Sequence, residues 1–222
     1  MNDFSTKEFN WDDKYSYDRG KVLSKKDLDE IENFGRYLDI DGDGIPYRTY
    51  PGTHPEKGAF FTRGSSHDEY AVYTEDGKVN ARNMKRILKK HKTASKLIPK
   101  PIIKSSNNSI GVIYFGGSDY SMIEALDILE KDGIILDSMR IRGFPFGIEV
   151  NDFIINHDLI FVVEQNRDAQ MKKLIIAELN VSPEKMISIL CFDGMPITAN
   201  FIDKEIQSYL AEKKVKELIR EK

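Results

Sequence analysis

The feature that most constrains the fold is an alternation of apolar runs and helical patterns that begins after residue 109. Short runs rich in branched and aromatic residues predict four buried strands, at 110–115, 133–140, 158–165 and 186–192. Segments with helical spacing follow each run, at 118–133, 147–157, 168–180 and 198–222. Strands that alternate with helices need right-handed crossovers, which give a mostly parallel sheet with helices on both faces. We therefore predict an α/β domain over 105–222.

The first part of the chain, 1–104, has a different pattern. Ser24 is a good N-cap for a helix over 24–38. The high Gly and Pro content of 39–77 then predicts a long irregular loop, a kind of segment that is often functional or an interface. A polar linker, 104–109, leads into the first buried strand.

An amphipathic helix is expected between this loop and the linker, beginning near residue 80. Its apolar stripe contains Met84, Ile87, Leu88 and His91. Pro99 and Pro101 should end it. We therefore describe residues 1–104 as an irregular, loop-rich and helical segment that precedes the α/β domain.

Composition excludes several classes of protein. The 33 basic and 36 acidic residues give a net charge of −3, so no overall field attracts nucleic acid. No apolar run approaches the roughly 20 residues that span a bilayer, and the polar beginning of the sequence has no apolar signal core. The single cysteine, Cys191, cannot form an internal disulfide or hold an iron–sulfur cluster alone. Cys191 lies in an apolar run and should be buried, and we expect a cytoplasmic globular protein.

The stretch DIDGDG, 39–44, resembles the start of a calcium-binding loop. Asp39, Asp41, Asp43 and Gly44 match its first half, but the twelfth position, which needs a bidentate glutamate, is Tyr50. An EF-hand is therefore excluded, and either a looser cation site on the three aspartates or an Asp-rich turn remains. The same letters contain GDG, but the asparagine that a thiamine diphosphate motif needs roughly 25–30 residues later is absent.

Two groups of residues lie where predicted strands end in the α/β domain. Gly116, Gly117 and Ser118 follow the first strand and begin a helix, so they form either an anion site or a tight turn in which Ser118 is the N-cap. Glu164 and Asn166 follow the third strand, at the edge where open α/β sheets bind ligands. A polar loop that packs on another domain would explain the second pair equally well.

Four dispersed stretches, taken together, carry a resemblance to a known family. They are YDRGKVL (17–23), DGDGIPYRTYPGTHPEKGAFFTRGSSHDEYAVYTED (41–76), VVEQNRDAQM (162–171) and DGMPITANFI (193–202). In this order they resemble the α subunit of 2-oxoacid:ferredoxin oxidoreductases, and the 2-oxoglutarate-type branch is the nearest. The resemblance runs from about Trp11 to Ile202 without a large gap.

The resemblance implies a domain plan and an activity. Such α subunits have a pyrimidine-binding domain followed by a domain similar to the transketolase C-terminal domain. Residues 105–222 would be this second domain, and 1–104 the segment that normally connects the two. The complete enzyme converts a 2-oxoacid, here 2-oxoglutarate, to acyl-CoA and CO2 and reduces ferredoxin, using thiamine diphosphate, Mg2+, an iron–sulfur cluster and CoA.

This sequence lacks the pyrimidine-binding domain and the iron–sulfur ligands of the family. The chain alone should therefore bind none of these cofactors and be inactive, and it should act in assembly and in framing the active site. The implied partners are the β subunit, the remainder of the α subunit and, through the complex, ferredoxin. We expect an oligomeric assembly that contacts neither nucleic acid nor membrane.

The resemblance also directs attention to polar residues of the long loop. Candidates for contacts with substrate, CoA or a partner subunit are Arg48, Thr49, His54, Thr62, Arg63 and His67, with Glu164 and Asn166 in the α/β domain. Arginine and histidine suit carboxylates and phosphates. The competing hypothesis is a stand-alone, non-catalytic α/β module. Such a module would bind an anion through Gly116–Ser118 or a cation through Asp39, Asp41 and Asp43.

Overall fold

The computed structural model describes residues 14, 16–59 and 66–220. The chain divides into two compact units, of which the first ends at Leu97 and the second begins at Ile98. No helix in the described part of the chain is both long enough and apolar enough to cross a bilayer.

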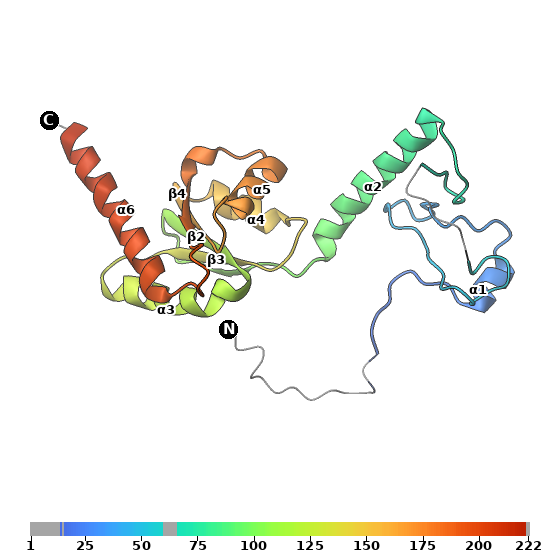
Figure 1. Cartoon of the computed structure of the whole chain (residues 1–222), viewed down its shortest axis with the longest axis horizontal. Coiled ribbons are helices and arrows are strands. Elements are labelled where there is room, and N and C mark those ends of the chain that lie inside the picture. The colour runs from blue at the N-terminus through green and yellow to red at the C-terminus, as the bar shows by residue number, and fades with distance from the viewer. Residues whose placement is uncertain (1–13, 15, 60–65, 221–222) are drawn as a thin grey trace. The chain divides into compact units, whose positions relative to one another are not determined.

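The C-terminal unit contains the predicted sheet (Figure 1). Its strands are β1 (Ile102–Lys104), β2 (Ile110–Phe115), β3 (Asp137–Ile141), β4 (Leu159–Glu164) and β5 (Met186–Leu190). Their order across the sheet is β1-β3-β2-β4-β5. The four strands from β2 to β5 are parallel to their neighbours, whereas β1 pairs antiparallel with β3. The predicted mostly parallel α/β fold is confirmed.

The edge strand β1 was not predicted. All of its three residues are exposed, so it has no buried apolar pattern. It also precedes the linker of 104–109 and the boundary between 104 and 105 that the sequence suggested. The third predicted strand matches β4 closely, but β3 begins later than expected, at Asp137 instead of residue 133.

Helices cover both faces of the sheet. They are α3 (Asp119–Lys131), α4 (Ile148–Ile155), α5 (Gln170–Leu179) and α6 (Ala199–Arg220). Side chains alternate between the faces along each strand, as the pleat requires. Val112 packs on one face with residues of α3 and α6, and its neighbour Ile113 packs on the other with residues of α4 and α5. Cys191 is buried in the first of these clusters, as expected, and burial raises the pKa of its thiol.

The N-terminal unit contains two helices and irregular chain. The first helix, α1 (Lys25–Glu30), begins at the predicted N-cap: the Ser24 hydroxyl accepts a hydrogen bond from the Asp27 amide, and Asp27 reciprocates. The prediction that it extends to residue 38 is wrong. Ile31 is extended, and the amide of Tyr37 donates to the carbonyl of Glu69. Tertiary contacts with a later segment therefore replace the helical hydrogen bonds.

The second helix, α2 (Gly77–Leu97), confirms the predicted helix, but the apolar residues of its stripe are exposed. Met84, Ile87 and Leu88 are 47%, 45% and 69% exposed. The buried residue of α2 is a polar one, Asn83, whose amide donates to the carbonyl of His67. This helix thus packs within its unit through polar groups and leaves the apolar stripe, defined as Met84, Ile87 and Leu88, in solvent.

Candidate functional site

The DIDGDG loop binds a cation that belongs to the chain itself. Nζ of Lys21 lies 2.6 Å from Asp41 Oδ2 and 2.8 Å from Asp43 Oδ2. Burial acts to lower the pKa of Lys21, but these two carboxylates outweigh it and raise the pKa above its ordinary value. Lys21 in turn lowers the pKa of both aspartates. Asp39 instead accepts a hydrogen bond from the Gly44 amide at 2.9 Å.

The three aspartates therefore do not converge as a metal site in this structure. Among the residues the structure describes, no group of three His, Cys, Asp or Glu side chains could hold a metal ion. The alternative interpretation of the stretch, an Asp-rich turn, fits the observed contacts. Asp43 Oδ1 accepts from the Ile45 amide two residues later at 2.8 Å, a typical aspartate turn.

Gly44 places this loop against the backbone of α2. Its φ is +84°, and a Cβ atom there would lie 2.3 Å from the Lys90 nitrogen. The approach lets Arg86 donate to the Gly44 carbonyl at 3.1 Å and Thr93 donate to the Asp43 carbonyl at 2.6 Å. The loop is thus a docking element of the N-terminal unit, and only glycine fits at its point of closest contact.

Three loop candidates have separate structural partners. The Arg48 guanidinium donates to the Arg19 carbonyl at 2.8 Å. Buried Thr49 donates to the Gly58 carbonyl at 3.2 Å. His54 Nδ1 accepts from the amides of residues 56 and 57, and its Nε2 lies 3.4 Å from Asp29 Oδ1. These side chains order the loop and do not form one catalytic group.

Of the remaining loop candidates, the structure describes only His67, and its contacts are structural. The ring of His67 stacks on Tyr37 with the centroids 4.0 Å apart, and its Nδ1 lies 2.9 Å from the Asp68 carbonyl oxygen. Thr62 and Arg63 lie outside the described residues.

A cavity in the N-terminal unit collects positive charge around Arg48. Its volume is about 250 Å3. The residues that line it are Arg19, Gly20, Lys21, Arg36, Ile45, Pro46, Arg48 and Lys90. We call it the basic pocket. Sequence reasoning found only Arg48 of its cationic residues, because the others come from three separate stretches that no motif connects.

Glu164 and Asn166 form hydrogen bonds with backbone amides at the start of α5. The Glu164 side chain is fully buried, and its carboxylate accepts hydrogen bonds from the amides of Met171 at 2.7 Å and Lys172 at 3.0 Å. Asn166 donates to the same carboxylate at 2.8 Å and accepts from the Gln170 amide at 3.2 Å. A buried carboxylate at a helix N-terminus satisfies free amides and the helix dipole. The predicted ligand edge is occupied here by a capping network.

Gly116, Gly117 and Ser118 form a short 3-10 helix that leads into α3. Gly116 has a φ of +59°, which accounts for the glycine. Ser118 is the N-cap residue of α3, as the turn interpretation has it, but its buried side chain makes no capping hydrogen bond. Its hydroxyl instead accepts from Gln165 at 3.1 Å, which ties the ends of β2 and β4 together.

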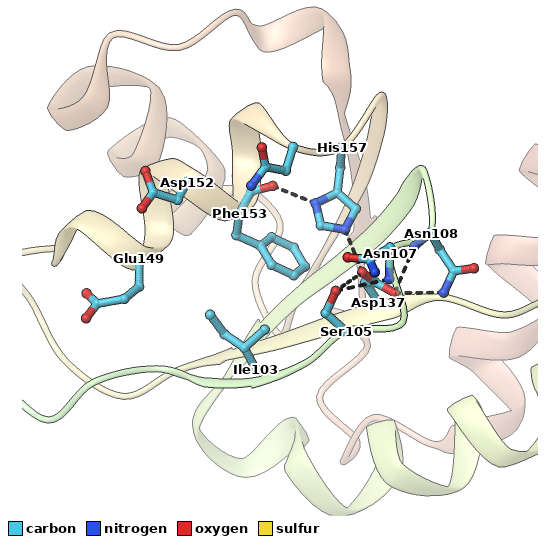
Figure 2. Close-up of a pocket in the computed structure, with 10 residues that line it drawn as sticks. Ile103, Ser105, Asn107, Asn108, Asp137, Glu149, Asp152, Phe153 and His157 are labelled. Atoms are coloured by element: carbon cyan, nitrogen blue, oxygen red, sulfur yellow. Dashed lines mark hydrogen bonds and ion pairs between the residues drawn. The ribbon is translucent and has the colours of Figure 1, made fainter.

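A second cavity, of about 570 Å3, lies at the amino ends of the strands in the C-terminal unit. Figure 2 shows Ser105, Asn108 and His157 grouped around Asp137, with Glu149 and Asp152 on α4 farther along the same cavity. Sequence reasoning missed this cluster. The only signal was an aspartate at the start of an apolar strand, which has no distinctive spacing.

Asp137 is a buried, fully partnered carboxylate. Burial acts to raise its pKa, but hydrogen bonds from Ser105, Ser106 and Asn108 outweigh burial and hold the pKa well below the ordinary value. His157 lies beside it, with Nε2 3.3 Å from Asp137 Oδ2 and Nδ1 2.6 Å from the Phe153 carbonyl oxygen. Because both ring nitrogens face acceptors, only the imidazolium form donates to both. The cluster is a structural centre that fixes the 105–108 loop to β3.

Comparisons with known proteins agree with the resemblance described above. No family model matches the chain. The α subunit of 2-oxoacid:ferredoxin oxidoreductase 2 from Aeropyrum pernix is 28% identical over 185 residues, which cover 81% of this chain and 27% of that protein. The 2-oxoacid:ferredoxin oxidoreductase α subunit of Saccharolobus solfataricus is 25% identical over 197 residues, or 86% of this chain and 30% of that protein.

A solved structure has the same fold. It is the 2-oxoglutarate:ferredoxin oxidoreductase from Magnetococcus marinus with 2-oxoglutarate, coenzyme A and succinyl-CoA bound. The match has a TM-score of 0.70 at 18% identity and covers 81% of this chain and 31% of that one. The chain thus resembles α subunits of this oxidoreductase family over most of its own length, and it spans less than a third of the relatives it matches.

Proposed function

We propose that this chain is the C-terminal part of an α subunit of a 2-oxoacid:ferredoxin oxidoreductase. The observation that carries the proposal is sequence similarity to two such α subunits over 81% and 86% of the chain. The α/β fold of the C-terminal unit supports it, because a solved oxidoreductase of this kind shares that fold. In this proposal the unit beginning at Ile98 corresponds to the transketolase-C-like domain.

The reaction we propose for the complete enzyme is oxidative decarboxylation of 2-oxoglutarate, which yields an acyl-CoA, CO2 and reduced ferredoxin. The ligands of the Magnetococcus marinus structure support this choice of 2-oxoacid. Thiamine diphosphate with its Mg2+ and an iron–sulfur cluster would belong to other parts of the complex. Among the described residues, no three His, Cys, Asp or Glu side chains are grouped as metal ligands.

The role we propose for this chain is assembly with the β subunit and with the remainder of the α subunit. The apolar stripe of α2 supports this role. Met84, Ile87 and Leu88 are exposed on one face of a helix that already packs by another face. Adjacent exposed apolar side chains are typical of surfaces that a partner covers.

Reconstitution tests the proposal. The chain would be co-expressed with a β-type subunit and the preceding α-subunit domains, and 2-oxoglutarate-dependent reduction of a viologen dye would be measured. We expect activity only when all parts are present. Turnover by the chain alone, or a complex of the other parts that is equally active without it, would contradict the proposal.

A matched pair of variants tests the assembly surface. Leu88→Asp should abolish co-purification with the partner subunits, because it places a charge in the apolar stripe. Lys85→Ala, at an exposed position of the same helix, should leave co-purification unchanged. Equal recovery of both variants would show that the stripe is not an assembly surface.

A further inference from the structure

One buried ionisable pair of the C-terminal unit is not used by the proposed function. His157 and Asp137 are 4% and 1% exposed, and both line the cavity of about 570 Å3. His157 Nε2 lies 3.3 Å from Asp137 Oδ2, and its Nδ1 lies 2.6 Å from the Phe153 carbonyl oxygen. Because a buried polar group is costly unless it has a partner, the protonation of this ring bears on the packing around it.

Only the imidazolium form of His157 donates to both oxygens. A neutral ring carries one proton, which the shorter of the two contacts would keep on Nδ1. The lone pair of Nε2 would then face the Asp137 carboxylate. In the other tautomer, the lone pair of Nδ1 would face the Phe153 carbonyl oxygen. Loss of one proton therefore turns an attractive contact into a repulsive one, whichever nitrogen loses it.

The charged residues that face His157 in the described part of the chain are Asp137 on β3 and Lys185 before β5. Burial acts to raise the pKa of Asp137, but its hydrogen bonds hold the pKa well below the ordinary value, so this carboxylate stays ionised near neutral pH. Lys185 Nζ donates to the His157 carbonyl at 3.0 Å. Glu149 and Asp152 lie farther along the cavity (Figure 2). Histidine is the side chain that ordinarily changes charge between about pH 5 and pH 8, so His157 is the member of this group that titrates there.

The ring of His157 has little room to turn away from Asp137. Its centroid lies 4.1 Å from that of the Phe153 ring. On β2, Gly111 packs against the same two rings, and a Cβ atom there would lie 2.8 Å from Phe153 Cε1 and 3.1 Å from His157 Cδ2. The lack of a side chain at Gly111 thus lets the backbone of β2 enclose the ring. A repulsion between His157 and Asp137 would therefore displace the carboxylate and not the ring.

The Asp137 carboxylate holds the loop that connects β1 to β2. It accepts hydrogen bonds from the Ser105 hydroxyl, from the Ser106 amide at 2.9 Å, and from the amide and side chain of Asn108 at 3.3 Å and 2.7 Å. Ser105 and Ser106 are exposed, whereas Asp137 is buried. A shift of the carboxylate is therefore transmitted to an exposed loop, which lines one side of the cavity (Figure 2).

We propose that the contact between His157 and Asp137 is a proton-controlled latch for the 105–108 loop. While His157 is protonated, the contact is attractive and the loop is held to β3 beside the cavity. When His157 loses its proton, the carboxylate is repelled, and the loop loosens together with the edge strand β1 that precedes it. A rise in pH through the neutral range thus opens one wall of the cavity. This inference goes beyond the proposed function and does not depend on it.

Hydrogen exchange of the full chain, followed by NMR from about pH 5 to about pH 8, tests the latch. We expect the protection of the Ser106 and Asn108 amides, corrected for the intrinsic effect of pH on exchange, to fall about tenfold as the pH rises, because a charged hydrogen bond is lost. His157→Gln should lower this protection at the acidic end of the range and remove the fall. The control is His54→Gln, which lies in the N-terminal unit and should retain the fall.

Two results would overturn the proposal. They are a protection of both amides that does not change with pH in the unaltered chain, and a fall that persists unchanged in His157→Gln. If His157→Gln does not fold by circular dichroism, the ring signals of His157 in the unaltered chain decide the question, identified by their Overhauser contacts with Phe153. A fall that follows the titration of this ring supports the latch, and one that follows another group contradicts it. No other subunit is present, so this failure is separate from a failure of the oxidoreductase reconstitution.

Discussion

Different kinds of contact stabilise the interior of each of the two units of this chain. In the C-terminal unit, apolar side chains from both faces of a five-stranded sheet pack under helices, and polar groups such as Glu164 and Asp137 secure the ends. In the N-terminal unit, backbone carbonyls, charged side chains and glycine contacts hold irregular chain to α2. The comparison shows that specific polar contacts can order a loop-rich segment whose described residues form no large buried apolar cluster.

The largest expected effect comes from the apolar core of the C-terminal unit. Phe161→Ala, at a fully buried position of β4, should lower the free energy of unfolding by about 3–5 kcal/mol. Chemical denaturation followed by circular dichroism measures this change. The matched surface change Ile155→Ala, at a 61% exposed position, should cost far less. Similar costs at the two positions would show that the sheet core does not dominate this unit.

The equivalent experiment in the N-terminal unit uses glycine. Gly44→Ala should destabilise that unit by roughly 2–4 kcal/mol, because it combines a positive φ with a Cβ that would lie 2.3 Å from the Lys90 nitrogen. Gly52→Ala is the control, with a φ of +85° but nothing within 4 Å of the added atom, and should cost only about 1 kcal/mol. Hydrogen exchange of the 39–46 loop and α2 measures the difference. Equal protection in the two variants would argue against a backbone contact at Gly44.

Asp137→Asn tests whether a polar cluster contributes to the stability of the C-terminal unit. At pH 7 the variant should be less stable by roughly 1–3 kcal/mol, because charged hydrogen bonds to Ser105 and Asn108 are weakened. The folded-state pKa of Asp137 is depressed, so its contribution is present above the unfolded pKa of about 3.9 and is lost as the pH falls below it. The difference in free energy of unfolding between the unaltered chain and the variant should therefore become smaller from pH 6 to pH 3. A difference that is independent of pH would show that the charge is not the cause.

The smallest effect is expected at the start of α1. Ser24→Ala removes the side chain that accepts from the Asp27 amide and should cost about 1 kcal/mol. Ser24→Thr keeps a hydroxyl at the N-cap and should be close to neutral. Thermal unfolding of the three proteins measures both changes. A neutral Ser24→Ala would mean that the short helix depends on its tertiary contacts alone.

The same contrast explains what could be predicted from the sequence. The runs that form β2 and β4 could be recognised in the sequence, because a strand that is buried on both faces must be apolar throughout. The edge strand β1 could not be recognised, since it is exposed and takes its geometry from hydrogen bonds to β3. Likewise the end of α1 depends on Glu69, which lies far along the sequence.

The candidate site was predicted less well than the fold. Arg48 was a candidate from the sequence alone. Arg19, Arg36 and Lys90 could not be found in this way, because they lie in separate stretches and only the fold places them around one cavity. Glu164 and Asn166 were placed correctly at a strand end, yet local capping of α5 accounts for their hydrogen bonds. A polar residue at a sheet edge therefore indicates a position in the fold more reliably than it indicates a ligand.

The pairing of Lys21 with Asp41 and Asp43 has a consequence for how the N-terminal unit responds to its surroundings. A loop that depends on bound calcium is ordered only while the ion is bound, and a chelator that removes the ion unfolds the loop. Here the positive charge is carried by the chain, so its stoichiometry is fixed and it cannot be diluted or chelated. In this loop the Lys21 ammonium takes the place that a metal ion has in a calcium-binding loop. EDTA should therefore leave the hydrogen exchange of the loop unchanged.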